Sequence, residues 1–201
     1  MLDLAAASVG LVVVSPILLL VALLIKADSK GPVFFRQERV GRNSNAFSIY
    51  KFRTMVEDAS RRGGQLTADG DARITRVGRV LRRLKIDELP QLLNVLRGEM
   101  SLVGPRPEVR RYVDLFRDDY EQILRVPPGI TDLASLKYRD ESSLLETAAD
   151  PEREYLTRLL PDKIALAKEY VRRSSPLLDV SIILRTVVRI FTAGRESPGP
   201  R

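Results

Sequence analysis

The sequence of 201 residues contains no cysteine and no histidine. These absences exclude disulfides, thiolate nucleophiles, zinc sites of the Cys/His kind, and every triad or general base built on imidazole. Any catalysis must therefore use carboxylates, hydroxyls or amines. Tryptophan is also absent and aromatic residues make up only 6% of the chain. Few rings are thus available to stack on nucleic-acid bases.

The chain is basic, with 33 Lys and Arg against 26 Asp and Glu and a net charge of +7. Most of these basic residues are arginines, and a guanidinium group grips phosphate in a bidentate manner. A GC-rich genome would produce the same bias without any function. The length suits one domain with one main core.

Residues 4–25 carry no charge and form an apolar run long enough to cross a bilayer. The run lacks the basic leader and the small-residue cleavage site of a signal peptide, so we expect it to remain in the mature protein. Basic residues follow it and predict that the body of the protein lies on the cytoplasmic side of the membrane: Lys26, Lys30, Arg36, Arg39 and Arg42.

Ser15 and Pro16 interrupt the middle of this run. Pro16 leaves the Val12 carbonyl without its helical partner and predicts a kink, where the Ser15 hydroxyl can help to satisfy the freed backbone. Each half reaches about 15 Å, which is half of a bilayer. Two geometries stay open: a bent helix that crosses, or a helix-break-helix that returns to the same face. We predict the re-entrant form.

Beyond this segment the pattern predicts an α+β fold that is mostly helical. Strands are expected at 33–35 and 46–52, joined by a turn at 43–45 into a small hairpin. Residues 56–72 are polar, contain glycine and lack periodicity, so we expect a mobile loop beside a site.

Apolar residues at helical spacing predict an amphipathic basic helix at 74–84 and a second helix that Asp87 caps and Gly98 stops. Residues 140–162 read as helical and acidic with breakers at Pro151 and Pro161, and 162–173 continue as helix. Residues 177–191 are amphipathic, which fits a helix on the membrane interface or one that faces the core.

The chemistry concentrates between Lys51 and Arg106, around the adjacent acids Asp87 and Glu88. First-turn carboxylates commonly do no more than complement a helix dipole. Here basic residues flank them, and acids among bases at a helix N-terminus can hold a Mg²⁺-bound diphosphate. Basic residues alone would equally suit nucleic acid or anionic lipid. The flanking residues are Arg79, Arg82, Arg83, Lys85 and Arg106, the last held between two prolines.

Four sequence motifs carry a family resemblance. They are RQERVGRN at 36–43, YKFRTM at 50–55, DARITRVGRVLRRLKIDELPQLLNVLRGEMSLVGPRPE at 71–108, and PGIT at 128–131. With these motifs in order over nearly its whole length, the chain resembles the bacterial sugar transferases called monotopic phosphoglycosyl transferases. It looks like their minimal catalytic form, without the extra membrane helices that longer members carry before the hairpin.

The resemblance implies transfer of a sugar-1-phosphate from a UDP-sugar to undecaprenyl phosphate. UMP would be released and a covalent aspartyl-phosphosugar intermediate would form, at the cytoplasmic face of the bacterial inner membrane. This would be the first membrane step of glycoconjugate assembly, such as exopolysaccharide biosynthesis. Mg²⁺ is the expected cofactor, no nucleic-acid partner is expected, and a homo-oligomer is compatible with the sequence. The sugar and the pathway stay open.

The family's functional residues are matched one by one. Asp87 matches the nucleophile and Glu88 its acidic partner, and both are candidate Mg²⁺ ligands. Ser15 and Pro16 match the pair that bends the membrane helix. The matches to substrate phosphate-binding positions are Arg82, Arg106, Arg139 and Lys51.

The chain departs from the family's usual pattern after PGIT. The common continuation Gly-Leu-Ala-Gln-Val-Asn-Gly-Arg appears here as Asp-Leu-Ala-Ser-Leu-Lys-Tyr-Arg at 132–139.

The expected organisation is a re-entrant membrane segment at 1–28, a catalytic domain on the cytoplasmic face at 29–191, and a disordered tail at 192–201.

Two other functions compete with the transferase. One is a membrane-tethered, non-enzymatic protein that binds anionic lipid or nucleic acid through its arginines. The other is a membrane-anchored phosphatase that forms an aspartyl phosphate and passes it to water. Dependence of UMP release on added polyprenyl phosphate separates both from the transferase.

Overall fold

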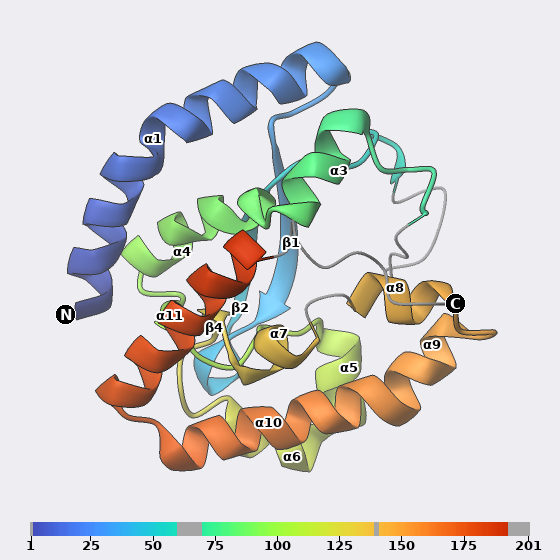
Figure 1. The fold of residues 1–201 in the computed structure, drawn as a ribbon. Coiled ribbons are helices and arrows are strands. Elements are labelled where there is room, and N and C mark those ends of the chain that lie inside the picture. Colours follow the sequence, from blue (N-terminus) through green and yellow to red (C-terminus); the bar gives the residue numbers. More distant parts are fainter. Residues whose placement is uncertain (1, 60–69, 139–140, 193–201) are drawn as a thin grey trace.

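The computed structural model describes residues 2–59, 70–138 and 141–192. Helices account for 63% of the structure and accompany two small two-stranded sheets, so the α+β prediction is confirmed. Figure 1 shows the N-terminal helix α1 (blue) arching along one side of the molecule, beside α3 and α4, with α10 (orange) on the opposite side.

Helix α1 spans Leu2–Asp28 and continues through Pro16. Figure 1 shows it bent about its middle. The prediction of a kink is confirmed, but the prediction that the helix breaks into two is wrong. The Ser15 hydroxyl donates a hydrogen bond of 2.8 Å to the Val12 carbonyl, the group that Pro16 leaves without a helical donor. A local partner for that carbonyl lets the helix bend without unwinding.

Both ends of α1 are bonded to the same body of the protein. Near its start, the Asp3 carboxylate accepts hydrogen bonds from the Ser101 hydroxyl at 2.8 Å and from the Leu102 amide at 3.4 Å. At its end, the Asp28 carboxylate accepts one from the Val77 amide at 3.0 Å. Between these ties α1 packs along α4. The helix is therefore attached at both ends to the side of the protein that contains α4.

A buried arginine fixes the turn that follows α1. Arg53 is 6% exposed and donates hydrogen bonds to the Ser29 carbonyl at 2.8 Å and the Ser29 hydroxyl at 3.0 Å, and also to the Lys30 carbonyl. Arg53 directly follows strand β2, so the end of α1 is attached to the end of that strand.

The outer surface of α1 is apolar. Its exposed large side chains range from 44% to 81% exposed, whereas its buried residues are Ala7, Val21 and Ile25. Length and composition would let this helix cross a membrane. A surface of exposed leucine and valine on this scale is typical of contact with lipid.

The predicted hairpin is confirmed. Strands β1 (Phe34–Val40) and β2 (Ala46–Phe52) pair in antiparallel fashion, with Phe34 opposite Phe52. The short 3₁₀ turn η1 (Arg42–Ser44) joins them. Strand β1 extends well beyond the predicted 33–35. Of the predicted loop at 56–72, residues 60–69 lie outside the described part of the chain.

Helix α3 spans Arg76–Arg83 and confirms the predicted basic helix. The Thr75 hydroxyl caps it by accepting from the Gly78 amide at 3.0 Å. A Cβ at Gly78 would lie 2.1 Å from the Thr54 carbonyl oxygen, so glycine permits the close approach of α3 to the chain after β2. Leu81 is buried in the cluster that α3 shares with α1.

A second helical segment with Asp87 and Glu88 in its first turn and its stop at Gly98 is confirmed, but the prediction that Asp87 caps it is wrong. The segment Ile86–Gln91 forms the 3₁₀ helix η2, and the α-helix α4 begins only at Leu92 and ends at Leu96. The residue before η2 is Lys85, which adopts a left-handed conformation with φ 57°. Pro90 has no amide hydrogen and cannot donate the α-helical bond to Ile86, which favours the tighter 3₁₀ winding.

A second, parallel pair of strands was not predicted from the sequence. Strand β3 (Ser101–Val103) pairs with β4 (Gly129–Thr131), which starts at the PGIT motif. The two strands are three residues each and carry no periodic signal that sequence reasoning could use. Two short helices connect them: α5 (Arg110–Leu115) and α6 (Arg117–Ile123).

The C-terminal third is helical. Pro161 was predicted to be a breaker, but the helical path continues through it from the π-helical turn η3 into α10, of which Pro161 is the second residue. The helices are α7 (Leu133–Lys137), α8 (Glu141–Glu146), α9 (Pro151–Glu154), the π-helical turn η3 (Tyr155–Leu159), α10 (Leu160–Arg173) and α11 (Pro176–Thr192).

Helix α11 uses two faces differently. Ile182 is buried with Val103 and Tyr170, while Leu177 is 84% and Leu184 60% exposed. The core-facing interpretation is confirmed for the face of Ile182, and contact of the exposed face with the membrane interface stays a prediction. Thr192 belongs to the helix, and the rest of the tail predicted to be disordered, 193–201, lies outside the described residues.

The two-ended attachment of α1 predicts that both of its ends lie on the same side of the membrane. The chain has no cysteine, so single cysteines at Leu2 and Ala27, both exposed, can be labelled selectively. We expect both sites to be shielded from an impermeant thiol reagent in intact cells and to react after permeabilisation. Labelling of Leu2→Cys from outside, with Ala27→Cys protected, would mean that α1 spans the bilayer.

Candidate active site

The two adjacent acids lie in different surroundings because η2 turns them apart. Asp87 is 8% exposed, while the Glu88 side chain is 12% exposed and faces β2 and the loop at 104–108. The left-handed residue Lys85 turns the chain sharply between α3 and η2. A non-glycine residue in this conformation costs about 1 kcal/mol, so the surrounding structure must hold it.

Glu88 is engaged by two cations. Its Oε1 atom accepts from Lys51 Nζ at 2.8 Å and from Arg106 Nη2, while Oε2 accepts from Arg106 Nη1 at 3.3 Å. Burial alone would raise the pKa of the Glu88 carboxyl, but the charges of Arg106 and Lys51 outweigh it and hold that pKa well below its usual range. The charge of Glu88 in turn raises the pKa of Arg106. Glu88 and Arg106 are therefore charged, whereas burial, which the charge of Glu88 only partly offsets, lowers the pKa of Lys51.

Asp87 has the opposite character. Burial, and after it the charge of Glu88, raises the pKa of the Asp87 carboxyl, although Lys51, Lys85 and Arg82 oppose the shift. Its Oδ1 atom is buried and has no hydrogen-bond partner in the described part of the chain. A buried carboxylate oxygen without a partner is costly, and such groups are typical of sites that receive a ligand or react.

A second unpaired group lies on α3. Arg82 Nη1 is buried and has no hydrogen-bond partner among the residues that the structure describes. The charge of Arg82 acts on Asp87, so the two groups lie in the same electrostatic neighbourhood. A guanidinium N–H without an acceptor, whose charge acts on a carboxylate with one unpaired oxygen, suits a ligand that bears phosphate oxygens.

Contacts with Gly129 and through Glu108 fix the loop that carries Arg106. The Gly129 amide donates to the Pro105 carbonyl at 3.0 Å, and a Cβ at Gly129 would lie 2.0 Å from the Gly104 nitrogen. On the other side, Glu108 is buried and accepts hydrogen bonds from Arg39 at 2.9 Å and from the Tyr155 hydroxyl at 2.7 Å. Glycine at position 129 permits the close contact with Gly104, and the ion pair of Glu108 with Arg39 fixes the other side of the loop.

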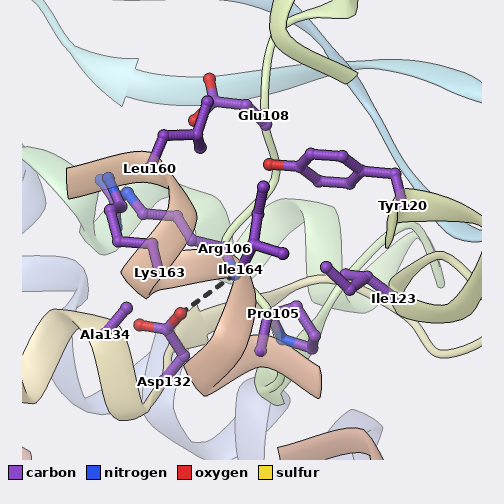
Figure 2. Close-up of a pocket in the computed structure, with 11 residues that line it drawn as sticks. Pro105, Arg106, Glu108, Tyr120, Ile123, Asp132, Ala134, Leu160, Lys163 and Ile164 are labelled. Atoms are coloured by element: carbon purple, nitrogen blue, oxygen red, sulfur yellow. Dashed lines mark hydrogen bonds between the residues drawn. The ribbon is translucent and has the colours of Figure 1, made fainter. Parts of the chain in front are cut away.

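A small pocket lies behind this loop, between Arg106, α6 and α10 (Figure 2). The Tyr120 ring extends into it from α6, and Asp132 lies on the opposite side, bonded to the backbone of Arg106. Burial raises the pKa of Tyr120, so its hydroxyl keeps its proton. Lys163 also lines the pocket and forms an ion pair of 3.0 Å with Glu141.

The comparison with known proteins covers nearly the whole chain. Residues 1–193 match the family model described as Bacterial sugar transferase. The chain belongs to this family. The match includes α1, the hairpin and every element that contributes to the site.

Named relatives of this bacterial sugar transferase are similar over the same span. It is 40% identical to the UDP-N-acetylgalactosamine-undecaprenyl-phosphate N-acetylgalactosaminephosphotransferase of Aeromonas hydrophila, over 95% of this chain and 43% of the relative. It is 44% identical to the undecaprenyl-phosphate glucose phosphotransferase of Komagataeibacter xylinus, over 93% of this chain and 34% of the relative. The chain thus spans less than half the length of these two relatives.

A shorter relative matches at nearly full length. The chain is 42% identical to the exopolysaccharide production protein PSS of Rhizobium leguminosarum bv. phaseoli, over 92% of this chain and 91% of the relative. The fold described here therefore corresponds to the part that long and short members of the bacterial sugar transferase family share.

Within this family member, the structure brings some of the sequence-derived site residues together and not others. Lys51, Glu88 and Arg106 are in direct contact, and the charges of Lys51 and Arg82 act on Asp87. Arg139 lies outside the described residues. Ser15 and Pro16 lie in the bend of α1, where the Ser15 hydroxyl bonds within the helix, and the structure does not bring them to this cluster among the residues that it describes.

Sequence reasoning missed the residues that position the site. Asn94 is fully buried, accepts from the Tyr50 amide at 3.0 Å and donates to the Ser48 carbonyl at 2.8 Å, which fixes the strand that carries Lys51. A single polar residue in the apolar run LLNVL was a usable signal. Glu108 and Arg39 are 69 positions apart, and only the fold pairs them.

The site offers one clear oxygen to a divalent cation. The described residues contain no group of three or more potential ligands that could hold a metal ion. Glu88 has both oxygens on Arg106, and one of them also on Lys51, whereas Asp87 Oδ1 is unpaired. Mg²⁺ prefers one or two carboxylates together with substrate phosphates, so the donor set fits an ion that a diphosphate shares with Asp87.

The ion pairs of Glu88 predict a large cost for losing its charge. Glu88→Gln leaves Lys51 and Arg106 partly buried without a counter-charge, which we expect to destabilise the fold by about 3 kcal/mol. The corresponding fall in Tm is roughly 6 to 12 °C for a domain of this size, measured by thermal unfolding in detergent. Glu38→Gln, at an exposed position of β1, is the matched control. Equal Tm values for the two variants would contradict this assignment.

Proposed function

We propose that this protein transfers a sugar-1-phosphate from a UDP-sugar to undecaprenyl phosphate, releasing UMP, at the cytoplasmic face of the bacterial membrane. The first two relatives described above are named as undecaprenyl-phosphate sugar phosphotransferases. The third is named for exopolysaccharide production, which is one use of such a product.

One observation carries the proposal: two groups of opposite charge, Asp87 and Arg82, each have a buried atom without a partner in the described part of the chain, and the charge of Arg82 acts on Asp87. Asp87 Oδ1 lacks a donor and Arg82 Nη1 lacks an acceptor within the described residues. Glu88 and its two cations lie beside them. A diphosphate fits both groups, since its oxygens accept from Arg82 and its phosphorus is an electrophile for the Asp87 carboxylate.

The proposed reaction is two displacements at phosphorus. An Asp87 oxygen forms a bond to the phosphorus that bears the sugar, and the bond from that phosphorus to the bridging oxygen breaks, so UMP leaves with the electron pair. A phosphate oxygen of undecaprenyl phosphate then attacks the same phosphorus and displaces Asp87. Neither step requires a general base, which fits a chain without histidine.

The surrounding side chains prepare the first displacement. The raised pKa of Asp87 makes its carboxylate a better nucleophile once it is ionised. Glu88 orients Arg106 and Lys51, whose positive charge offsets the repulsion between a carboxylate and a diphosphate. Arg82 binds a phosphate oxygen from α3.

Mg²⁺ supplies further neutralisation of the diphosphate when it is bound. Asp87 is the protein ligand that we propose. Glu88, which the sequence also suggested as a Mg²⁺ ligand, has both oxygens bonded to cations of this chain. Its proposed role is therefore to position Arg106 and Lys51.

An exposed apolar surface lies next to the proposed site and offers a path for the acceptor lipid. Val80 is 56% exposed on α3, the helix that also carries Arg82, and Leu84, the residue directly after this helix, is 41% exposed. The apolar stripe of α3 continues from these residues to Val77 and Leu81, which pack with α1. A polyprenyl chain that stays in the bilayer can therefore present its phosphate beside Arg82.

The covalent step predicts a stoichiometric burst. UDP-sugar alone should release at most one equivalent of UMP per active site, and the peptide that contains Asp87 should gain the mass of one sugar phosphate. Asp87→Asn should abolish both, measured by UMP release and mass spectrometry. Asp114→Asn, an exposed aspartate on α5, should retain them. Normal turnover with ternary-complex kinetics and no adduct would show direct transfer.

The acceptor distinguishes the competing functions. Multiple turnovers should require undecaprenyl phosphate, with UDP-glucose and UDP-N-acetylgalactosamine as the first donors to test. Sustained UMP release without the lipid would mean that water is the acceptor and that the protein is a hydrolase. The absence of UMP release from every UDP-sugar would favour a non-enzymatic binding protein.

Metal removal gives an independent check. We expect EDTA to lower the turnover rate roughly 100-fold or more and added Mg²⁺ to restore it, because neutralisation of the diphosphate contributes several kcal/mol to such reactions. Turnover that is unaffected by EDTA would show that the basic side chains suffice.

A further inference from the structure

Asp132 lies at the junction between the Arg106 loop and helix α7. It is 3% exposed and follows strand β4 directly. Its Oδ2 atom accepts a hydrogen bond of 3.2 Å from the Arg106 amide, drawn as the dashed line in Figure 2. Its Oδ1 atom accepts one of 2.6 Å from the Ser135 amide and so caps α7. One carboxylate thus holds two separate backbone segments.

The Arg106 amide is the one backbone hydrogen-bond donor in the segment 105–107. Pro105 and Pro107 on either side have no amide hydrogen, so Arg106 carries the one backbone donor of this tripeptide. The prolines also restrict the φ angles around it. The bond to Asp132 therefore sets where the Arg106 backbone lies relative to β4 and α7.

The far end of α7 is anchored as well. Lys137 Nζ and the Tyr138 hydroxyl both contact Asp162 Oδ2 on α10, each at 2.7 Å. Helix α7 is five residues long and cannot be stable alone. It therefore connects α10 to the Arg106 loop, and Asp132 makes the bond at the loop end of this connection.

We propose that Asp132 is a positioning residue that holds the Arg106 guanidinium in register with Glu88 and with the donor diphosphate. This inference rests on the proposed function, because it assigns Arg106 to the binding of donor phosphate. Arg106 is bonded at both ends, through its backbone to Asp132 and through its side chain to Glu88. A displacement of about 1 Å at a reacting site can cost roughly 100-fold in rate.

The variant Asp132→Ser separates the two bonds of this carboxylate. Serine is a good helix cap, so its hydroxyl can keep the bond to Ser135, but the shorter side chain cannot also reach the Arg106 amide. We expect kcat/KM for UMP release to fall by roughly 10- to 100-fold. Asp150→Ser is the matched control: Asp150 caps α9 by accepting from the Arg153 amide at 3.0 Å and contacts nothing in the site. It should stay within about twofold of the wild type.

A double variant tests whether Asp132 acts through Arg106. In an Arg106→Gln background, Asp132→Ser should cost less than about threefold, because the group that it positions is already gone. A loss of general stability would instead add in full to the loss caused by Arg106→Gln. Full additivity would overturn the proposal.

Hydrogen exchange tests the contact without relying on activity. In a peptide covering residues 104–108, Asp132→Ser should speed exchange at least about tenfold, while a peptide covering 133–138 should keep its protection. If Asp132→Ser does not fold, Asp132→Asn keeps one acceptor oxygen and is compared with Asp150→Asn in the same assays. Unchanged exchange in 104–108 overturns the proposal. A wild type that releases no UMP from any donor defeats the proposed function instead, and the exchange result still decides the contact.

Discussion

The ion pairs of Glu88 with Lys51 and Arg106 determine the arrangement of the site. Partly buried charges are stable only when each finds its partner, and removing one member of such a set is far more costly than never having formed it. Glu88 comes from η2, Lys51 from β2 and Arg106 from the loop after β3. The three elements must therefore dock together for any of the three charges to be tolerated. Asp87 is oriented as a consequence, because it precedes Glu88 in the same tight turn.

The same pairing explains why two adjacent carboxylates take different roles. Glu88 uses the available cations, and its pKa lies well below the usual range. Asp87 is left with burial, a raised pKa and an oxygen without a partner. An acid whose charge is already compensated can position its neighbours, whereas one that lacks partners is available to a substrate. Further from the site, Asn94, Glu108 and Asp132 hold the backbones that carry these charges.

Much of the fold was predictable from local pattern. The hairpin, the basic helix α3 and the C-terminal helix α11 follow from alternation and helical periodicity, which are properties of neighbouring residues. The parallel pair of β3 and β4 was not predictable, because two three-residue strands pair only after the chain between them has folded. The 3₁₀ form of Ile86–Gln91 and the unbroken course of α1 through Pro16 were not predicted. In the first, Pro90 cannot donate the α-helical bond to Ile86; in the second, the Ser15 hydroxyl supplies a partner for the Val12 carbonyl.

The sequence by itself determined the kind of chemistry and the kind of surface. The absence of histidine and cysteine excludes imidazole and thiolate chemistry, and the acidic pair among arginines together with the long apolar run favours a phosphate-bearing substrate at a membrane. Only the tertiary structure decided which acid has both oxygens bonded and which keeps an oxygen unpaired among the described residues, which arginine pairs with Glu88, and that both ends of α1 attach to one body. The physical reason is distance along the chain: Glu88 and Lys51 are 37 residues apart, and Asp3 and Ser101 are 98 apart. Contacts of that separation leave no periodic trace in the sequence, since their energy depends on the burial and geometry that the whole fold creates.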